Sequence, residues 1–343
     1  MNNQRQTKQR FRCKMISWIT LIFYIFQPIV GVLANPQTNI APNGVEIVDI
    51  NAPNQSGVSH NQYDRFNVKE KGLIFNNSGE IINTTLAGYI LGNPNIKANS
   101  ASLILNEVIG TQPSYLNGYM EIAGNKAQLI IANPNGIIGN GFGFINTSRA
   151  VLTTGTPIFG DQGTLAGFNV NDGTIAIEGQ GLNANEIDRV DILAKAVEVN
   201  AGIWANQLNV VTGKNTVDND LNLQTSDLDE PIGVALDVSA LGGMYANKIR
   251  LIGTQNGVGV NSKGAIIATD SLTLSQQGKI LFAGTTLADQ TIDIKTKDQL
   301  ENQGQLHANG NLDIQAVSVN NGNLMTANQD VNLTASLVNS KGF

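Results

Sequence analysis

A twenty-residue repeat in the C-terminal half constrains the fold of this chain more than any other feature. The segments GAIIATDSLTL, GTTLADQTIDI and GQLHANGNLDI begin at Gly264, Gly284 and Gly304. Each has an alanine four residues after its glycine and apolar residues eight and ten residues after it. Alternation of period two indicates strands with one buried face, and a period of this length predicts one coil of a β-solenoid. No window between these strands has the length or 3.6-residue period of a helix, which disfavours an α/β solenoid.

The phase of the repeat predicts which side chains face inward. Ala268, Ala288 and Ala308 are expected to stack at a tightly packed inner position, and Thr285 is expected to point outward. A second pair of segments, GIWANQLNVV at 202–211 and GMYANKIRLI at 243–252, is 41 residues apart. We interpret this spacing as two coils plus one residue. At about twenty residues per coil, residues 155–343 would then form about nine coils.

Composition agrees with a solenoid and disfavours two other classes. Charged residues make up 14% of the 343, the formal charge is −6, and there are 36 glycines and many asparagines. Without a basic patch the chain is a poor nucleic-acid partner, and with 41% hydrophobic residues it lacks the signature of disorder. Asparagine side chains can form ladders along stacked coils, and glycine supplies positive φ at corners.

We therefore predict an all-β protein, a right-handed parallel β-helix with an N-terminal β cap formed by residues 35–70. An open solenoid end would invite edge-to-edge pairing unless it were covered. The sequence ends in mid-pattern at Phe343. This suggests a fragment or a truncated gene of a longer protein.

The first 34 residues have the pattern of a secretory signal peptide. A basic leader precedes an almost wholly apolar run at 16–30, and Val32-Leu33-Ala34 supplies small residues at the usual cleavage spacing. A membrane anchor is the alternative, but the run is shorter than the roughly 20 residues that span a bilayer. Cleavage between Ala34 and Asn35 would also remove Cys13, the single cysteine, so no disulfide would stabilise the exported chain.

Two Asn-Pro-Asn corners interrupt the strands of the N-terminal half. In the second corner an apolar run ends at Asn133-Pro134-Asn135-Gly136 and resumes at Ile137. Proline at the second position has the φ that a type I turn needs, Asn133 can bond the backbone two residues on, and glycine closes the turn. The first corner is Asn93-Pro94-Asn95-Ile96, forty residues earlier. Since forty residues correspond to two coils, both corners are expected on one side of the rod.

At these residues the sequence resembles the secretion domain of two-partner-secreted exoproteins, the family of filamentous haemagglutinins, haemolysins and contact-dependent-inhibition proteins. The resemblance rests on four segments: ANPNGI at 132–137, ASLILNEV at 101–108, GFINTSRAVLTTG at 143–155 and the corner at 93–96. The family usually has NPNL at the earlier corner, so Ile96 is a departure. Leucine to isoleucine keeps the apolar volume, and we expect it to be harmless.

The resemblance implies a route out of a Gram-negative cell and a division of the chain. Residues 35–213 would be the N-terminal secretion domain, 214–231 an acidic interrupting loop, and 232–343 haemagglutinin-type β-helix repeats. An Omp85-type outer-membrane transporter of the TpsB class, with POTRA domains, would recognise the N-terminal domain. The corners at 93–96 and 133–137 would serve this recognition, although each could equally be only a stable turn. The protein would be secreted or held at the cell surface, meeting a membrane only during secretion.

Three function classes follow. The first is a secreted adhesin with a host-cell or bacterial-surface receptor. The second is a truncated contact-dependent inhibition toxin or cytolysin that lacks its C-terminal effector. The third is a β-helix polysaccharide-degrading enzyme, for which Asp188, Arg189 and Asp191 are conceivable carboxylate and basic residues. They lie, however, in a segment that itself resembles the haemagglutinin family, so we expect no enzyme, no catalytic residue and no cofactor.

Histidines and acidic residues give no clear metal site. Only His60 and His307 occur, and neither has a histidine partner at metal-ligand spacing. His307 matches the outward positions of Ile267 and Leu287 in the repeat, so we expect it at the surface. The most acidic segment, residues 215–231, could supply oxygen ligands for calcium. A solvated loop that leaves the coil stack is the preferred interpretation, because no glycine-turned calcium loop follows.

Overall fold

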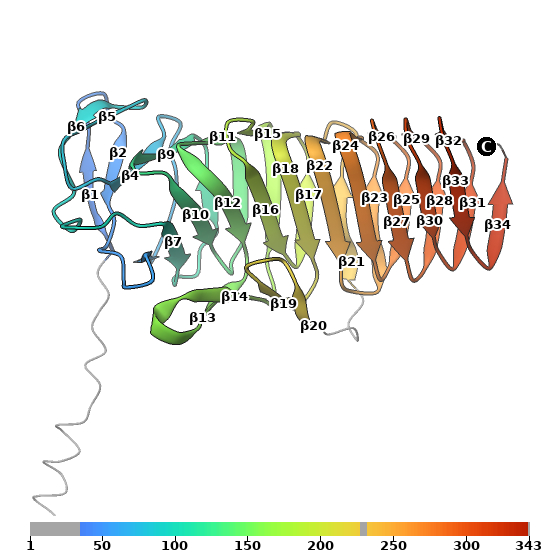
Figure 1. Ribbon diagram of the computed structural model, residues 1–343, viewed down its shortest axis with the longest axis horizontal. Helices are drawn as coiled ribbons and strands as arrows, with labels where there is room; N and C mark the ends of the chain where they lie inside the picture. The colour runs from blue at the N-terminus through green and yellow to red at the C-terminus, as the bar shows by residue number, and fades with distance from the viewer. Residues whose placement is uncertain (1–34, 227–231, 342–343) are drawn as a thin grey trace, which may run out of the picture. The chain divides into compact units, whose positions relative to one another are not determined.

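The computed structural model describes residues 35–226 and 232–341, which form one unit built around a stack of β-coils (Figure 1). A 28-stranded sheet winds through the whole stack, and its neighbouring strands are parallel except for the pairing of β1 with β2. The helical structure within the described residues is a single 3-10 turn, Asp161–Gly163. In the described part of the chain no helix is long and apolar enough to cross a membrane.

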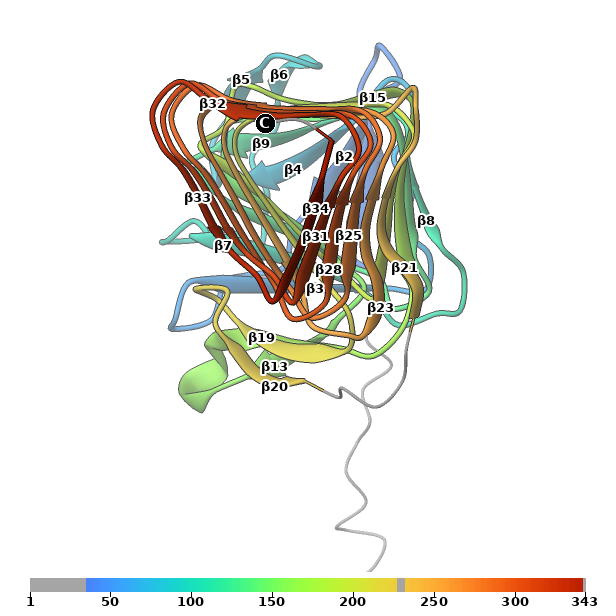
Figure 2. The ribbon, with the colours of Figure 1, turned by 90° about the vertical axis from the view of Figure 1, so that its right-hand side faces the viewer.

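Viewed along the stack, each coil has three sides, which we call faces A, B and C (Figure 2). Face A contains β2 (Glu46–Asp49), β4 (Leu73–Asn77), β9 (Tyr119–Gly124), the second parts of β11 (Ile137–Ile145) and β15 (Thr174–Ala184), the first parts of β18 (Gly202–Thr212), β22 (Gly243–Gly253) and β24 (Ala265–Gln276), and then β26 (Thr285–Ala288), β29 (Gln305–Ala308) and β32 (Leu324–Ala327). Face B contains β3 (Val58–Tyr63), β7 (Leu103–Val108), β10 (Ala127–Ala132), β12 (Thr147–Thr153), β16 (Arg189–Ala194), the second parts of β18, β22 and β24, and then β27 (Ile292–Thr296), β30 (Leu312–Gln315) and β33 (Val331–Thr334). Face C contains β8 (Ser114–Leu116), the first parts of β11 and β15, β17 (Ala196–Val199), β21 (Ile232–Val238), β23 (Gly257–Ser262), β25 (Lys279–Phe282), β28 (Gln299–Asn302), β31 (Ser318–Asn321) and β34 (Leu337–Ser340).

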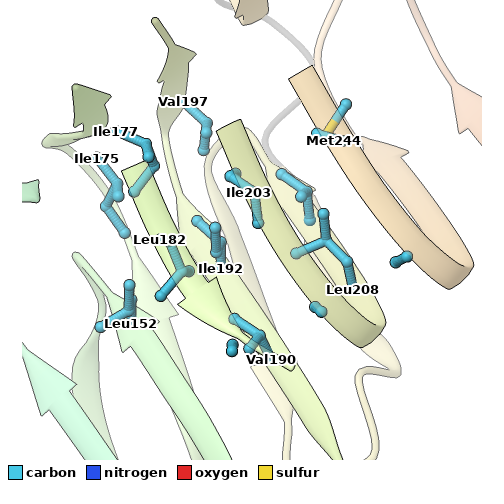
Figure 3. Close-up of a cluster of buried hydrophobic side chains, with 14 of the residues drawn as sticks. Leu152, Ile175, Ile177, Leu182, Val190, Ile192, Val197, Ile203, Leu208 and Met244 are labelled. Atoms are coloured by element: carbon cyan, nitrogen blue, oxygen red, sulfur yellow. The ribbon is translucent and has the colours of Figure 1, made fainter. Parts of the chain in front are cut away.

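The predicted parallel β-helix and its repeat register are confirmed. Ala268 pairs with Ala288 and Ala288 with Ala308, and all three are buried. Thr285 lies at an outward position and is half-buried. Apolar side chains fill the interior from one coil to the next, as the cluster around Ile192, Ile203 and their neighbours shows (Figure 3). Asparagine ladders also occur, for example from Asn302 Nδ2 to Asn321 Oδ1 at 2.8 Å.

The 41-residue spacing was misinterpreted from the sequence. Gly202 pairs directly with Gly243, so the two segments occupy adjacent coils. The surplus residues leave the stack between them, and residues 156–170 leave it in the same way two coils earlier, between β12 and β16. After residue 155 face B therefore has seven strands in the described chain, β16 to β33, and not about nine.

The two departing segments form a sheet of their own. This four-stranded antiparallel sheet contains β13 (Thr156–Phe159), β14 (Leu165–Val170), β19 (Asn215–Asp218) and β20 (Leu223–Ser226), and it lies along the lower side of the stack in Figure 1. Its buried side chains, among them Phe168 and Val217, pack against the outer side of face B. The expectation of a solvated acidic loop is thus wrong for 215–226, because this segment forms two strands of the sheet and buries apolar side chains such as Val217. Asp227, Asp229 and Glu230 of that segment lie outside the described residues.

An N-terminal cap is present as predicted, but it is not formed by residues 35–70 as a whole, because β2 and β3 of that segment are strands of the coil stack. β1 (Gln37–Ile40) pairs antiparallel with β2 and covers the free edge of the first coil. A hairpin of β5 (Ile82–Thr84) and β6 (Gly88–Ile90) adds to it. Ala41, Val45 and Ile90 pack with Ile74 of β4 in a small separate core.

Candidate functional site

The two Asn-Pro-Asn corners have the same hydrogen-bond geometry. At the second corner the carbonyl of Asn133 accepts the N–H of Gly136 at 3.1 Å, and its Oδ1 accepts the N–H of Asn135 at 2.9 Å. At the first corner Asn93 makes the equivalent bonds with the N–H groups of Ile96 and Asn95, again at 3.1 and 2.9 Å. Both corners are therefore turns capped by the first asparagine, as the sequence predicts.

The first asparagine of each corner also joins neighbouring coils. Asn133 Nδ2 donates to the carbonyl of Gln112 at 3.0 Å and to Oγ of Ser114 at 2.9 Å. Asn93 Nδ2 donates to the carbonyls of Ile50 and Asn76 at 2.9 and 2.8 Å. Asn133 is 0% exposed and Asn93 is 1% exposed. Neither side chain is available to a partner, so in the folded domain both asparagines stabilise the coil stack.

The accessible parts of the corners are the residues that follow. Pro94, Asn95 and Asn135 are exposed and Pro134 is half-buried. Ile96 and Ile137 are buried, so the isoleucine that replaces the family's usual leucine still fills an apolar position. Gly136 is required at its position: its φ is +110°, and a Cβ there would lie 2.9 Å from the carbonyl oxygen of Thr174.

The corners do not lie on one side of the coil stack. Asn93 sits at the ends of β2 and β4, where face A turns into face B, because it binds the carbonyl of Ile50 just beyond β2 and that of Asn76 near the end of β4. Asn133 follows β10 and precedes β11, where face B turns into face C. The expectation of a shared side is therefore wrong. It assumed uniform coils of twenty residues, but residues 78–102 leave the strands of the first coils to form the cap hairpin.

A surface groove of about 680 Å³ runs beside the second corner. Pro134 and Asn135 line one part of it, and the exposed carboxylates of Asp172, Glu178 and Glu198 line another. The N–H of Gly173 and the ammonium of Lys195 lower the pKa of Asp172, so this carboxyl stays ionised in mildly acidic solution. The groove thus places negative charge beside the only exposed atoms of the corner.

Of the residues considered for catalysis, Asp191 is held in buried hydrogen bonds and Asp188 faces solvent. Asp191 is 0% exposed, and its carboxylate accepts hydrogen bonds from Arg149 Nε at 2.6 Å, Arg189 Nε at 2.7 Å and Asn209 Nδ2 at 2.7 Å. Its oxygens are occupied by these partners and shielded from any substrate. Asp188 points to solvent, with its nearest cation, Lys126, at 3.7 Å. Among residues 35–226 and 232–341 no group of three or more His, Cys, Asp or Glu could hold a metal ion.

The two histidines lie on outer surfaces. His307 is in register with Leu287, as expected, and its ring nitrogens contact Thr326 Oγ1 and Asn309 Oδ1 at 2.8 and 3.0 Å. His60 Nε2 lies 2.7 Å from Glu107 Oε2. That hydrogen bond, together with one from Gln62, lowers the pKa of Glu107.

Sequence reasoning missed the partners of the corners and the carboxylates of the groove. The partners Gln112, Ser114, Ile50 and Asn76 depend on tertiary contacts that no local pattern reveals. The sequence does contain part of the information on the groove, because the alternation of apolar and polar residues in TIAIE and AVEV places Glu178 and Glu198 on the outer surface. Of the predicted cleavage site, Ala34 lies outside the described residues. Asn35 is exposed, and its Oδ1 accepts the N–H of Asp64 at 3.2 Å.

Comparison with known proteins decides the family. The model of the TPS secretion domain matches residues 32–282, which is most of the chain. The chain belongs to the TPS secretion domain family. The resemblance to two-partner-secreted exoproteins seen in the sequence is thereby confirmed.

Solved and curated relatives agree with this assignment. The crystal structure of the filamentous hemagglutinin secretion domain matches with a TM-score of 0.70 and 29% identity, over 90% of this chain and 98% of that one. The chain is 45% identical over 273 residues to "Toxin CdiA" of Yersinia pestis and 47% identical over 266 residues to "tRNA nuclease CdiA-2" of Burkholderia pseudomallei. These matches cover 78% and 76% of this chain, and each covers 8% of the relative. The chain thus spans about a tenth of the length of its curated relatives. It has the secretion domain of filamentous hemagglutinin and CdiA-type exoproteins, and such a domain serves export.

Proposed function

We propose that this TPS secretion domain is recognised by an outer-membrane transporter of the TpsB class, with POTRA domains, through the second corner and its acidic groove. The observation that carries the proposal is the exposed Pro134-Asn135 pair beside Asp172, Glu178 and Glu198. A rigid corner with fixed charges offers a preorganised surface, and opposite charge on the transporter would speed encounter and fix orientation.

Export would begin with the leader. Residues 1–34 direct the chain across the inner membrane, cleavage follows Ala34, and the transporter then passes the chain to the outside of a Gram-negative cell. We place the secretion domain at 35–213 and the haemagglutinin-type repeats at 232–343, with the coil stack continuous between them. Burial in each coil contributes about 25 cal/mol per Å² of apolar surface, so folding outside the cell would oppose backsliding.

The test exploits isosteric substitutions that leave the fold intact. We expect the double variant Glu178→Gln and Glu198→Gln to be secreted several-fold less in cells that carry the cognate transporter, with an unchanged melting temperature. The matched control is Glu80→Gln with Glu186→Gln, which removes two exposed charges away from the groove. Equal secretion of both double variants would contradict the role of the groove.

The exported protein is proposed to be an adhesin, with contact-dependent inhibition as the second candidate. The names of the relatives, toxin and tRNA nuclease, favour the second candidate, whereas the hemagglutinin match favours the first. Co-culture distinguishes them. A contact-dependent inhibitor, tested as the whole exoprotein, reduces the count of susceptible neighbours, and an adhesin increases attachment without killing.

We further propose that residues 35–343 do not act as an enzyme. The engagement of Asp191 by Arg149 and Arg189 supports this, because it removes the only buried carboxylate of the segment considered for sugar cleavage. Release of uronic acid from acidic polysaccharides by the purified domain would contradict the proposal.

A further inference from the structure

A column of outward-facing residues on face A carries three aromatic rings. Register places Tyr119 beside Gly143, Gly143 beside Asn183, Asn183 beside Trp204, and Trp204 beside Tyr245. Trp204 is 39% exposed, so part of its indole ring is accessible to a ligand. Nothing in the export proposal uses this column.

Glycines make room for the rings. A Cβ at Gly202 would lie 2.3 Å from the ring of Trp204, and a Cβ at Gly243 would lie 2.6 Å from the ring of Tyr245. Trp204 and Tyr245 are stacked, with ring centroids 6.0 Å apart and planes 12° apart. Tyr245 therefore supports one face of the indole and leaves the other face toward Asn183.

A pocket of about 360 Å³ lies between Trp204 and Tyr119. All of its described lining residues are uncharged, and its volume is at the lower end of the roughly 300–1,000 Å³ of small-molecule sites. Asn183 Nδ2 donates to the hydroxyl of Tyr119 at 3.1 Å, which fixes that side of the pocket. Within the described residues the side-chain amides of Gln180 and Asn185 make no hydrogen bond, and both side chains are exposed.

We propose that this pocket binds a neutral pyranose unit of a glycan, with the sugar ring stacked on Trp204. The C–H face of a pyranose is apolar and flat enough to pack on an indole, while its hydroxyls need donors and acceptors at the rim. The amides of Gln180 and Asn185 supply both kinds of group. The absence of charge among the lining residues disfavours an acidic sugar or a phosphate, and the proposal does not rest on recognition by the transporter.

The chain provides its own probe. Its two tryptophans are Trp18 and Trp204, so in the unit Asn35–Phe343, which has its own core, tryptophan fluorescence comes from Trp204 alone. Cellobiose, maltose, lactose and chitobiose are titrated against this unit. We expect a saturable change in tryptophan emission with at least one disaccharide, at a Kd below about 10 mM. No saturable change with any of the four would overturn the proposal.

Variants then locate the site by calorimetry with the same disaccharide. Trp204→Ala should abolish binding, and Trp204→Phe should retain it with about tenfold lower affinity. The matched control Tyr115→Ala removes an exposed aromatic ring from face C and should bind normally. Equal binding by Trp204→Ala and Tyr115→Ala, with both variants folded by thermal melting, would refute the site. Quenching of Trp204 by the POTRA region and by no sugar would also refute it, and would make the pocket a protein-docking surface.

Discussion

Replacement of Asn133 by alanine tests whether the corner acts mainly by holding coils together. The side chain is fully buried and takes part in four hydrogen bonds: two from its Nδ2, to Gln112 and Ser114, and two to its Oδ1, from the backbone and side chain of Asn135. A hydrogen bond contributes about 1 kcal/mol, and a buried group left without a partner costs about 1–3 kcal/mol. Allowing for non-additivity, we expect Asn133→Ala to lower the free energy of unfolding by about 3 kcal/mol.

This value exceeds the 1 kcal/mol or less that a capped turn alone would suggest. From the sequence only the turn bond was visible, and the smaller value would follow from it. The bonds to Gln112 and Ser114 raise the cost because they join one coil to the previous one. At about 2 °C per kcal/mol for a domain of this size, the melting temperature should fall by about 6 °C.

The matched comparison is Asn135→Ala. Asn135 is exposed, and its Nδ2 donates to the carbonyl of Gly110 at 2.8 Å and to Asn133 Oδ1 at 2.9 Å. Because water can replace the bonds of an exposed side chain, its loss should cost only about 1 kcal/mol. Melting temperature and transporter-dependent secretion are measured for both variants. If the two melt at the same temperature, the coil-joining role of Asn133 is refuted. Reduced secretion of a stably folded Asn135→Ala would assign recognition to the exposed part of the corner, and normal secretion would leave the corner a structural element.

Two further predictions address the coil interior and the pH response. Ala288→Phe should overpack the inner column and cost about 1–3 kcal/mol, while outward Thr285→Gln should be nearly silent; equal melting temperatures would contradict the register. The pKa of Glu107 is lowered chiefly by its hydrogen bond with His60. The ionised carboxylate therefore stabilises the folded state at neutral pH. This contribution is lost as the pH falls below the ordinary value of 4.5 and through the lowered pKa. Glu107→Gln should therefore have a lower melting temperature than the unmodified protein at pH 7, and this difference in melting temperature should shrink towards about pH 3. A constant difference across this pH range would contradict the stabilising role of the Glu107 carboxylate.

The repeat could be predicted from the sequence because it is encoded twice, in the spacing of Gly264, Gly284 and Gly304 and in period-two alternation. Each coil buries the side chains at the same positions of the repeat, so a slip of one residue in strand pairing would expose all of the inward-facing side chains. The departing segments could not be predicted, because coils of 40 and 41 residues imitate two coils of twenty. A signal was nevertheless present: runs such as LILNEV and QLIIA lack alternation, which is typical of strands buried on both sides. The sheet of β13, β14, β19 and β20 covers the outer side of these face B strands, whose inner side faces the core.

The direction of the corner contacts gives the export hypothesis a structural basis. Several corner asparagines donate from Nδ2 to carbonyls of an earlier part of the chain, at distances of 2.8 to 3.0 Å: Asn93 to Ile50 and Asn76, Asn133 to Gln112, Asn146 to Ile122 and Gly124, and Asn206 to Asn185 and Ile187. If the proposed export delivered the chain with its N-terminus first, each of these amides would meet acceptors that are already in place. Asn77 at the end of β4 and Asn302 at the end of β28 donate in the opposite direction, to Asn125 and to Asn321 and Leu324, so the direction holds for the corners named above and not for every corner. A coil that closes on its predecessor gains its hydrogen bonds at once, at about 1 kcal/mol each, and need not wait for the next coil. Under the export proposal, stepwise closure of this kind would favour outward movement of the remaining chain without an external energy source.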